Sequence, residues 1–481
     1  MTAFLISLAV LVGGYFLYGL LAEKVFGTDP ARTMPAYSKT DGVDFMPMPT
    51  WKVFLIQFLN IAGLGPIFGA IMGVLYGPAA FIWIVAGTIF GGAVHDFISA
   101  MMSIRSDGES LPELIGRQLG MPARQIMRLL SIVLLVLVGA VFVITPSNLM
   151  ASMTPGWAGT GFWMAVIFAY YLLATLLPVD KLIGRFYPVF GFALLFMAAG
   201  LSAVLIFGGH SIPVDFAGGF DSRYGNDGVH SVFPMMFVSI ACGAVSGFHA
   251  TQSPMMARCL KNEKLARPVF YGAMVAEGIV ALIWAAAAIT FTGGYDGLRE
   301  YMATHNGAGD LVHDISVGWL GTVGGILAIL GVVAAPVTTG DTALRSARLI
   351  VADMLHISQK PLLKRLLVSL PLFAGAFILM MIDFNILWRY FAWTNQCLAA
   401  ITLWGCTVFL ARAGRAYVLT LLPAMFMTAV VVCYIFFAPR PEGFGLGMPV
   451  AASIAAATVV LATAMFALWL RRRPALSRQL S

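Results

Sequence analysis

Charged residues are scarce in this chain. Only 11% of its 481 residues are aspartate, glutamate, lysine or arginine, whereas 60% are hydrophobic. A soluble domain carries roughly a quarter of charged residues, so this composition leaves too little polar surface for a water-exposed globule. The sequence therefore excludes an ordinary soluble fold.

Long polar segments and metal-binding motifs are also missing. The two longest polar stretches, 23–52 and 208–231, are too short to form a soluble domain. The five cysteines lie in or beside apolar segments without a CxxC pair, so neither a disulfide framework nor a metal-cofactor site is predicted. No HExxH motif is present, and an intramembrane enzyme is the least favoured class of function. We expect no cofactor apart from a coupling ion.

Apolar blocks of about 20 residues make up most of the chain. A helix of that length crosses roughly 30 Å of hydrocarbon, and only helices or closed barrels satisfy the backbone there. The blocks show no inside–outside alternation typical of barrel strands. We therefore predict an all-α polytopic membrane protein with about 13 transmembrane helices, at 2–22, 53–77, 78–104, 127–147, 160–178, 186–207, 232–257, 269–292, 315–340, 365–381, 384–410, 416–437 and 448–470.

The cationic residues determine the predicted orientation. Loops on one side of these spans hold 25 lysines and arginines, and the loops on the other side hold three. Cytoplasmic loops carry the excess of basic residues, so we expect the amino terminus outside and the carboxy terminus inside a bacterial cytoplasmic membrane. Because the net charge of +7 follows this topology, the expected partners are the lipid bilayer and a small-molecule substrate, and not nucleic acid.

Two spans contain residues that interrupt helices. The first has Gly63, Gly65 and Pro66 near its middle, and the second has Gly247 and Pro254. Proline removes a backbone donor and clashes with the preceding turn. Unwound backbone at membrane depth persists only where it lines protein or a watery cavity. The alternative is a pair of ordinary proline kinks with packing glycines.

The spacing of these breaks predicts an inverted repeat. Five spans separate one broken helix from the next, and the two helices enter the membrane from opposite sides. Transporters with inverted five-plus-five repeats of the LeuT/APC type place their substrate site where two discontinuous helices meet. The predicted parts are an N-terminal helix and loop at 1–52, repeats at 53–207 and 232–410, and two extra helices with a cytoplasmic tail at 411–481.

Several stretches carry a family resemblance. NIAGLGPIFGAIMG (60–73), AVHDFIS (93–99), SGFHATQSP (246–254) and GDTALRSARLIVAD (340–353) resemble the carbon starvation protein A family, over about residues 50 to 400. The resemblance implies an inverted-repeat transporter that imports peptides during nutrient starvation or carries pyruvate together with protons. The chain is shorter than the long members of the family and lacks much of their carboxy-terminal helical region.

We expect the substrate to bind at the two breaks. Pro66 suits the first position of the outer half-helix, so the amides of Leu64 and Gly65 would form an anion site at the positive end of that helix. Arg389, the one cation inside a span, is expected to reach outward or to attract anions. The predicted substrate-binding residues are Asn60, Gly63, Leu64, Gly65, Pro66, Ser246, Gly247, His249, Thr251, Gln252 and Asn395.

Ionisable residues inside spans are candidates for coupling, because their burial is costly. His249 is placed in the unwound second break, where its titration near neutrality allows proton exchange; the alternative is a structural histidine. Adjacent helical residues do not face each other, so His95 and Asp96 are not expected to pair. Asp96 is expected to pair with an arginine of a basic loop, or else to act with His95 as a gate or proton relay. Glu277 is either a proton carrier or a hydrogen-bonding packing residue.

The end of the ninth span offers a second coupling ion. Oxygen atoms of Thr338, Thr339 and Asp341, together with backbone carbonyls from Ala62 onwards, would supply the ligands that a sodium ion needs. The alternative is that Asp341 is the N-cap of a short cytoplasmic interfacial helix that ends near His356, reinforced by the arginine four residues later.

These patterns together predict a secondary active transporter, driven by protons or sodium, that imports peptides or small carboxylates such as pyruvate during starvation. A membrane channel or a nutrient sensor is the alternative function.

Overall fold

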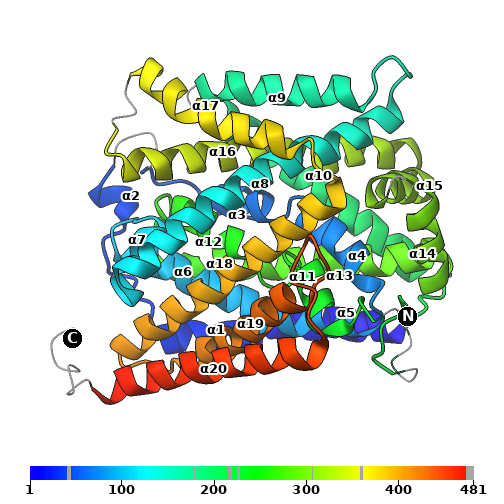
Figure 1. Cartoon of the computed structure of the whole chain (residues 1–481). Helices are drawn as coiled ribbons and strands as arrows, with labels where there is room; N and C mark the ends of the chain where they lie inside the picture. The colour runs from blue at the N-terminus through cyan, green and yellow to red at the C-terminus, as the bar shows by residue number, and fades with distance from the viewer. Residues whose placement is uncertain are drawn as a thin grey trace.

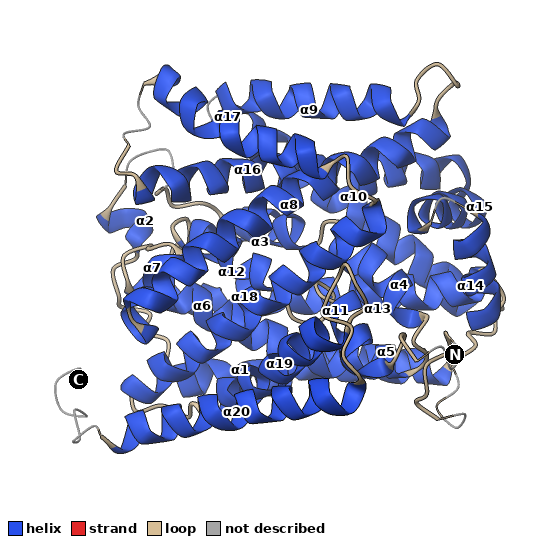
Figure 2. Ribbon diagram, viewed as in Figure 1, coloured by secondary structure: helices blue, strands red, loops and turns tan. Residues whose placement is uncertain are grey.

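The regular elements of the protein are helices. Every regular element in the part of the chain that the structure describes is helical (Figure 2). The helices run roughly side by side across the molecule, and the two termini lie at opposite ends (Figure 1). The computed structural model describes residues 1–40, 45–176, 179–214, 216, 219–224, 228–305, 307–357 and 361–472. The predicted tail beyond 472 therefore lies outside the described residues.

The first half of the chain forms ten α-helices and two π-helical turns, labelled η. They are α1 (Thr2–Phe26), α2 (Pro35–Ser38), α3 (Thr50–Ile61), η1 (Gly65–Gly69), α4 (Ala70–Val74), α5 (Ala79–Ala86), η2 (Gly87–Gly92), α6 (Ala93–Arg105), α7 (Leu111–Leu119), α8 (Met121–Met153), α9 (Thr160–Leu176) and α10 (Val179–Phe207).

The second half continues the same pattern, with η4 a 3-10 turn and the other short turns π-helical. Its elements are η3 (Val232–Met236), α11 (Phe237–Ser239), α12 (Gly247–Ala257), η4 (Glu263–Leu265), η5 (Arg267–Tyr271), α13 (Gly272–Phe291), α14 (Tyr295–Thr304), α15 (Ala308–Ala328), η6 (Ile329–Val333), α16 (Ala334–Met354), α17 (Leu362–Leu379), α18 (Phe384–Arg412), α19 (Val418–Phe437) and α20 (Met448–Arg471).

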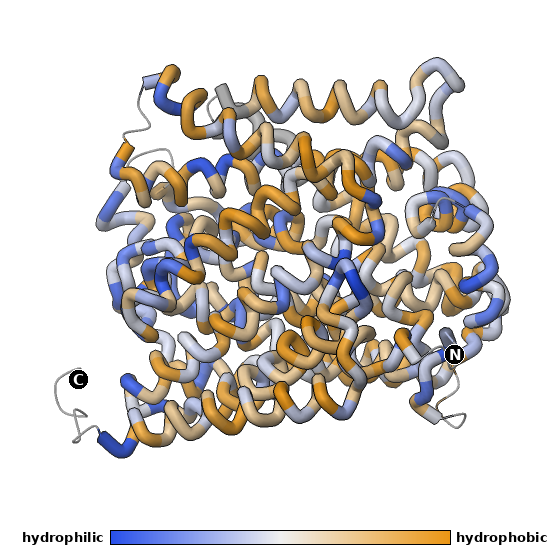
Figure 3. The backbone as a smooth tube through the Cα atoms, in the orientation of Figure 1, coloured by the Kyte–Doolittle hydropathy of each residue, from blue (hydrophilic) through white to orange (hydrophobic). Residues whose placement is uncertain are grey.

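Enough of these helices are long and apolar to make the chain a multi-pass membrane protein. Among the described residues, ten helices have the length and composition to cross a bilayer, or eleven if the bent pair Thr50–Ile61 and Gly65–Val74 forms one span. Apolar residues cover the lengths of the helices, and hydrophilic stretches gather at the two ends of the molecule (Figure 3). This confirms the helical membrane class. The total of thirteen spans and the inverted repeat stay predictions.

The first predicted break is confirmed. Helix α3 ends at Ile61, the chain bends by 52°, and helical structure resumes at Gly65. Pro66 occupies the first turn of η1, as predicted, where its missing N–H leaves no bond unmade.

The second break exists but lies nearer the amino terminus than predicted. Helical structure stops at Ser239 and resumes at Gly247, so the non-helical segment is 240–246. His249 therefore lies in the first turn of α12 and not in unwound backbone. Pro254 lies inside α12 without ending it, because contacts with neighbouring helices outweigh its local tendency to break the helix.

The two breaks contact each other directly. A Cβ atom placed on Gly65 would overlap the side chain of Cys242, and one placed on Gly243 would lie 3.7 Å from the Cα of Pro66. The hydroxyl of Thr88 donates a hydrogen bond of 3.2 Å to the carbonyl of Gly243. Glycine is therefore needed at position 65 for close packing of the two broken segments, whereas the tight contact of Gly243 would be with the Cβ of Ala281 on α13, at 2.9 Å.

The predicted interfacial helix after Asp341 is wrong. Helix α16 runs without interruption through this position, so Asp341 lies in its interior and is no N-cap. Gly340 looks like a helix end in the sequence, but a Cβ there would overlap the hydroxyl of Tyr171, so its small size serves packing against α9. The irregular backbone lies earlier, at Gly321, where φ is 61° within α15.

The loop between α19 and α20 turns back onto α18. Arg389 pairs with Glu442 at 2.7 Å, and the hydroxyl of Tyr390 donates to the carbonyl of Pro441 at 2.7 Å. Arg389 thus neutralises a carboxylate of the protein itself. The two extra helices are joined to α18 through this pair and through hydrogen bonds such as that of Trp404 with Thr428 on α19.

Candidate functional site

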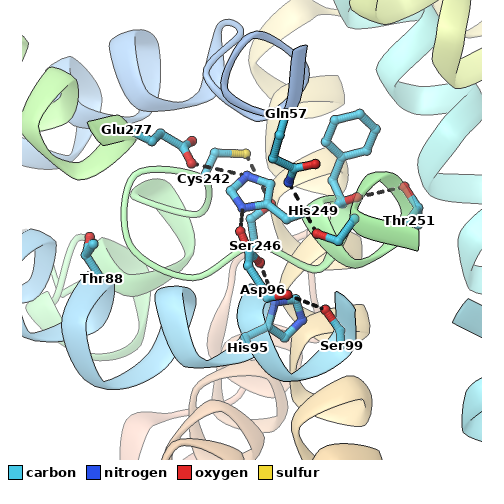
Figure 4. A network of polar contacts seen from close by, with 12 residues as sticks. Gln57, Thr88, His95, Asp96, Ser99, Cys242, Ser246, His249, Thr251 and Glu277 are labelled. Carbon is cyan, nitrogen blue, oxygen red and sulfur yellow. Dashed lines mark hydrogen bonds and ion pairs between the residues drawn. The ribbon is translucent and has the colours of Figure 1, made fainter. Parts of the chain in front are cut away.

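Four titratable side chains form one contiguous cluster in the interior (Figure 4). Nδ1 of His95 lies 2.8 Å from Oδ1 of Asp96, and Nδ1 of His249 lies 3.0 Å from Oδ2 of the same carboxylate. Nε2 of His249 lies 3.4 Å from Oε2 of Glu277, which is an ion-pair distance without hydrogen-bond geometry. All four side chains are fully buried. His95, Asp96 and His249 thus form a hydrogen-bonded network, and Glu277 lies within ion-pair distance of it.

Glycines bring these helices together. His95 and Asp96 lie on α6, His249 lies on α12, and Glu277 lies on α13. Helix α6 follows the π-helical turn η2, in which a Cβ on Gly92 would overlap the carbonyl of Ala244 in the second break. The absence of side chains at Gly87, Gly91 and Gly92 of η2 lets α6 approach the second break closely enough for its carboxylate to reach His249.

The expectation for His95 and Asp96 is wrong in two respects. The side chains of these adjacent residues do meet, because the imidazole of His95 is long enough to reach the carboxylate next to it along α6. Asp96 pairs with the two histidines, and no lysine or arginine within the described part of the chain pairs with it. The basic-loop residue Arg105, at the end of the same helix, pairs with Glu263.

The composition of this cluster makes its charge depend on bound protons. Counted from ionised carboxylates and neutral imidazoles, the four groups reach a net charge of zero only when they share two added protons. Buried ion pairs lose several kcal/mol per ion on leaving water, and among the described residues no lysine or arginine pairs with Asp96 or Glu277, whose only ion-pair partners are histidines. Loss of one proton therefore leaves an uncompensated negative charge in the interior.

Buried amides line the adjoining faces of α3 and α12. Nε2 of Gln57 donates to Oγ of Ser253 at 3.2 Å, and Nε2 of Gln252 donates to Oγ1 of Thr251 at 3.0 Å. The oxygens of Gln57, Asn60 and Gln252 are buried without a partner among the described residues, so each remains a free acceptor. The sequence reading missed Gln57, although its position three residues before Asn60 places both on one helix face.

Backbone donors are available at the first break. In the described structure, Gly63, Leu64 and Gly65 donate no backbone hydrogen bond, and Pro66 has no N–H. Buried N–H groups without an acceptor are rare, so this segment is suited to an anion or water. Gly65 faces the side chain of Cys242, which means that close packing already explains its lack of a side chain.

The polar residues at the second break contact one another. Oδ1 of Asn395 accepts bonds from the hydroxyl of Ser246 at 3.1 Å and from the N–H of Phe248 at 2.7 Å. A Cβ on Gly247 would overlap the backbone of α18. Ser246, Gly247 and Asn395 thus join α12 to α18, and in this structure their contacts are internal to the protein.

The predicted sodium ligands make bonds within their own helix. Thr338 and Thr339 each donate to the carbonyl of Ala335, at 2.7 and 3.0 Å, and Asp341 pairs with Arg345 at 3.4 Å. Among the described side chains, no group of three His, Cys, Asp or Glu residues is arranged to hold a metal ion. The role of Ala62 and these three residues in sodium binding stays a prediction.

The sequence matches one protein family along most of its length. The model of the family described as "Carbon starvation protein CstA" matches residues 1–161, 157–316 and 300–433. An uncharacterised membrane protein of Haemophilus influenzae is 44% identical over 335 residues, which cover 60% of this chain and 90% of that protein.

Two relatives from Escherichia coli carry functional names. The peptide transporter CstA is 28% identical over 366 residues, and the pyruvate/proton symporter BtsT is 29% identical over 343 residues. The matches cover 63% and 59% of this chain but 52% and 48% of those proteins. The chain thus spans about half the length of these two named relatives.

Solved structures of secondary transporters share the fold. A Na⁺-coupled sialic acid symporter aligns with a TM-score of 0.53 at 14% identity, covering 96% of this chain and 97% of its own. A mutant of the manganese transporter of Eremococcus coleocola aligns with a TM-score of 0.53 at 11% identity, covering 88% and 96%. At such identities the likeness concerns the fold alone.

Proposed function

This chain belongs to the carbon starvation protein CstA family, and we propose that it is a proton-coupled secondary transporter that imports a small carboxylate or a short peptide across the bacterial cytoplasmic membrane. We include in this proposal the inverted five-plus-five repeat, with the amino terminus outside. The named relatives are transporters, which favours transport over an enzymatic function.

The proposal rests on the buried cluster of titratable side chains, in which Glu277, His249, Asp96 and His95 follow one another. When the cluster holds two added protons it is neutral and can stay buried. When it releases one, the remaining negative charge is stable only if water or a cation reaches it. Release of the proton is therefore linked to opening of the site toward one side of the membrane, which is the coupling that a symporter requires.

The position of the cluster connects proton binding to the substrate. His249 lies two residues after Gly247, where α12 begins, and the second break packs on the first break through Cys242 and Gly65. A carboxylate held by the amides of Gly63, Leu64 and Gly65 would lie at the positive end of the following half-helix. Arg389, the cation that the sequence places inside a span, is paired with Glu442 and is therefore not free to bind a carboxylate.

The test is uptake by purified protein in proteoliposomes. We expect saturable counterflow of labelled pyruvate or of a labelled short peptide, and accumulation of the same compound when an inward proton gradient is imposed without sodium. Replacing the carboxylate of the substrate with an amide should weaken binding at least about tenfold, or about 1.4 kcal/mol. Equal binding of acid and amide would contradict the anion site, and flux that never saturates would favour a channel.

Sodium coupling is the competing form of the proposal. Thr339 keeps lone pairs beyond the hydrogen bond that it donates to Ala335, so it is able to bind a cation. In that case uptake would require sodium, and Thr339→Val would raise the sodium concentration for half-maximal rate. Full uptake in sodium-free buffer would eliminate this form.

A further inference from the structure

Helix α12 begins without a cap of its own. Ser246 occupies the N-cap position, but its side chain accepts no hydrogen bond from the first turn. The first N–H groups of a helix normally need such an acceptor. Here the acceptor comes from α18, because Oδ1 of Asn395 accepts the N–H of Phe248 at 2.7 Å across 147 residues of sequence.

The same amide holds the rest of the second break. Oδ1 of Asn395 also accepts the hydroxyl of Ser246 at 3.1 Å, and its Nδ2 donates to Sγ of Cys242 at 3.4 Å. Asn395 is fully buried, and Gly247 packs directly on the backbone of α18. One side chain therefore fastens both ends of the non-helical segment, and the start of α12, to a single helix.

The residue after the capped amide is His249. The groups that face its ring are Asp96 on α6, which also binds His95, and Glu277 on α13. The direction of the imidazole toward these carboxylates follows from the position of the first turn of α12. That position is defined by α18 through Asn395.

We propose that Asn395 is the positioning residue for His249: by capping α12 from α18, it makes the alignment of His249 with Asp96 and Glu277 depend on the position of α18. This inference rests on the proton-coupled transport proposed above. Asn395 thereby has a role other than direct contact with the substrate, and α18 becomes the element that transmits conformational change to the proton site.

The test compares two substitutions with a neighbouring control. Asn395→Ala removes the acceptor, and Asn395→Leu removes it while preserving side-chain volume. Gln396→Ala is the control, since this equally buried amide donates only to the carbonyl of Phe237 within the described structure. The readout is the pH dependence of counterflow and of proton-driven uptake in proteoliposomes.

We expect the alanine and leucine variants to shift the pH midpoint of transport by at least about one unit, while the control keeps the wild-type midpoint. An unchanged midpoint in the leucine or alanine variant, or a shift of the same size in the control, would overturn the role of Asn395 alone. A wild-type rate that does not depend on pH would overturn proton coupling and this role together.

Discussion

At the scale of single residues, the central feature of the molecule is a buried carboxylate, Asp96, that contacts two histidines. His249 and Glu277 stand out in the sequence because a buried ionisable group is costly in a span. Their connection through Asp96 could not be read from the sequence, since His249 and Asp96 are 153 residues apart. The pairing of His95 with Asp96 was missed for a different reason: the spacing rule for helix faces ignores how far an imidazole reaches.

The lack of a side chain at Gly65 has two possible explanations. The sequence predicts that it is small so that the backbone can approach a ligand, whereas the structure places the side chain of Cys242 against it. We expect Gly65→Ala to lower stability by about 1–3 kcal/mol, the usual cost of overpacking, measured as a fall in apparent melting temperature in detergent.

The double variant Gly65→Ala with Cys242→Gly separates the two explanations. If packing is the reason, removing the Cys242 side chain makes room for the new methyl group, and both stability and transport recover relative to Gly65→Ala. Cys242→Gly alone is the control for the extra backbone freedom, which costs about 1 kcal/mol. A stable double variant that fails to bind substrate would restore the ligand explanation.

At the scale of elements, the first break was predicted correctly and the second was displaced. Gly65 and Pro66 do lie at a break between helices. Gly247 and Pro254, in contrast, lie within α12, because α18 packs against Gly247 and the surrounding helices keep the backbone helical at Pro254. Similarly, the Thr-Thr-Gly-Asp sequence before Thr342 resembles a helix end, yet its hydroxyls bond back to earlier carbonyls and the helix continues. Tertiary packing overrides local signals at both places.

The segment that follows α12 is held by a buried glutamate in η4 that the sequence reading did not single out. Glu263 is fully buried, binds Arg105 from α6 at 3.1 Å and Arg32 from the N-terminal loop at 3.2 Å, and accepts the N–H of Asp29 at 2.7 Å. Arginines of the basic loops thus hold the segment after α12 in place, in addition to indicating the predicted topology.

We expect Glu263→Ala to destabilise the protein by about 2 kcal/mol or more. Removing one partner of a buried pair costs roughly 3–5 kcal/mol, and the partial exposure of Arg32 and Arg105 reduces that figure through solvent screening. Thermal unfolding in detergent measures the effect, with Glu300→Ala on α14 as the control. Equal stability of the two variants would show that the contacts of Glu263 do not stabilise the protein.

At the scale of the whole molecule, the membrane class, the helical fold and the family follow from the sequence. Hydrophobic length and the absence of alternation suffice for the first two, because the bilayer allows few architectures. The arrangement that makes a site does not follow, since it depends on α6, α12, α13 and α18 meeting at two breaks. Only the fold brings the protonatable groups together in one cluster.

The central claim is that the buried cluster of titratable side chains couples protons to substrate movement. The most direct test is substrate-driven proton flux. Proteoliposomes that contain a trapped pH indicator receive pyruvate or a short peptide in sodium-free buffer, with wild-type protein, His249→Gln and the exposed control His305→Gln. The account predicts acidification of the lumen with substrate for the wild type and for the control. For His249→Gln it predicts none, even where counterflow exchange persists. Normal substrate-driven acidification by His249→Gln, or a wild-type signal that appears only with sodium, would contradict it.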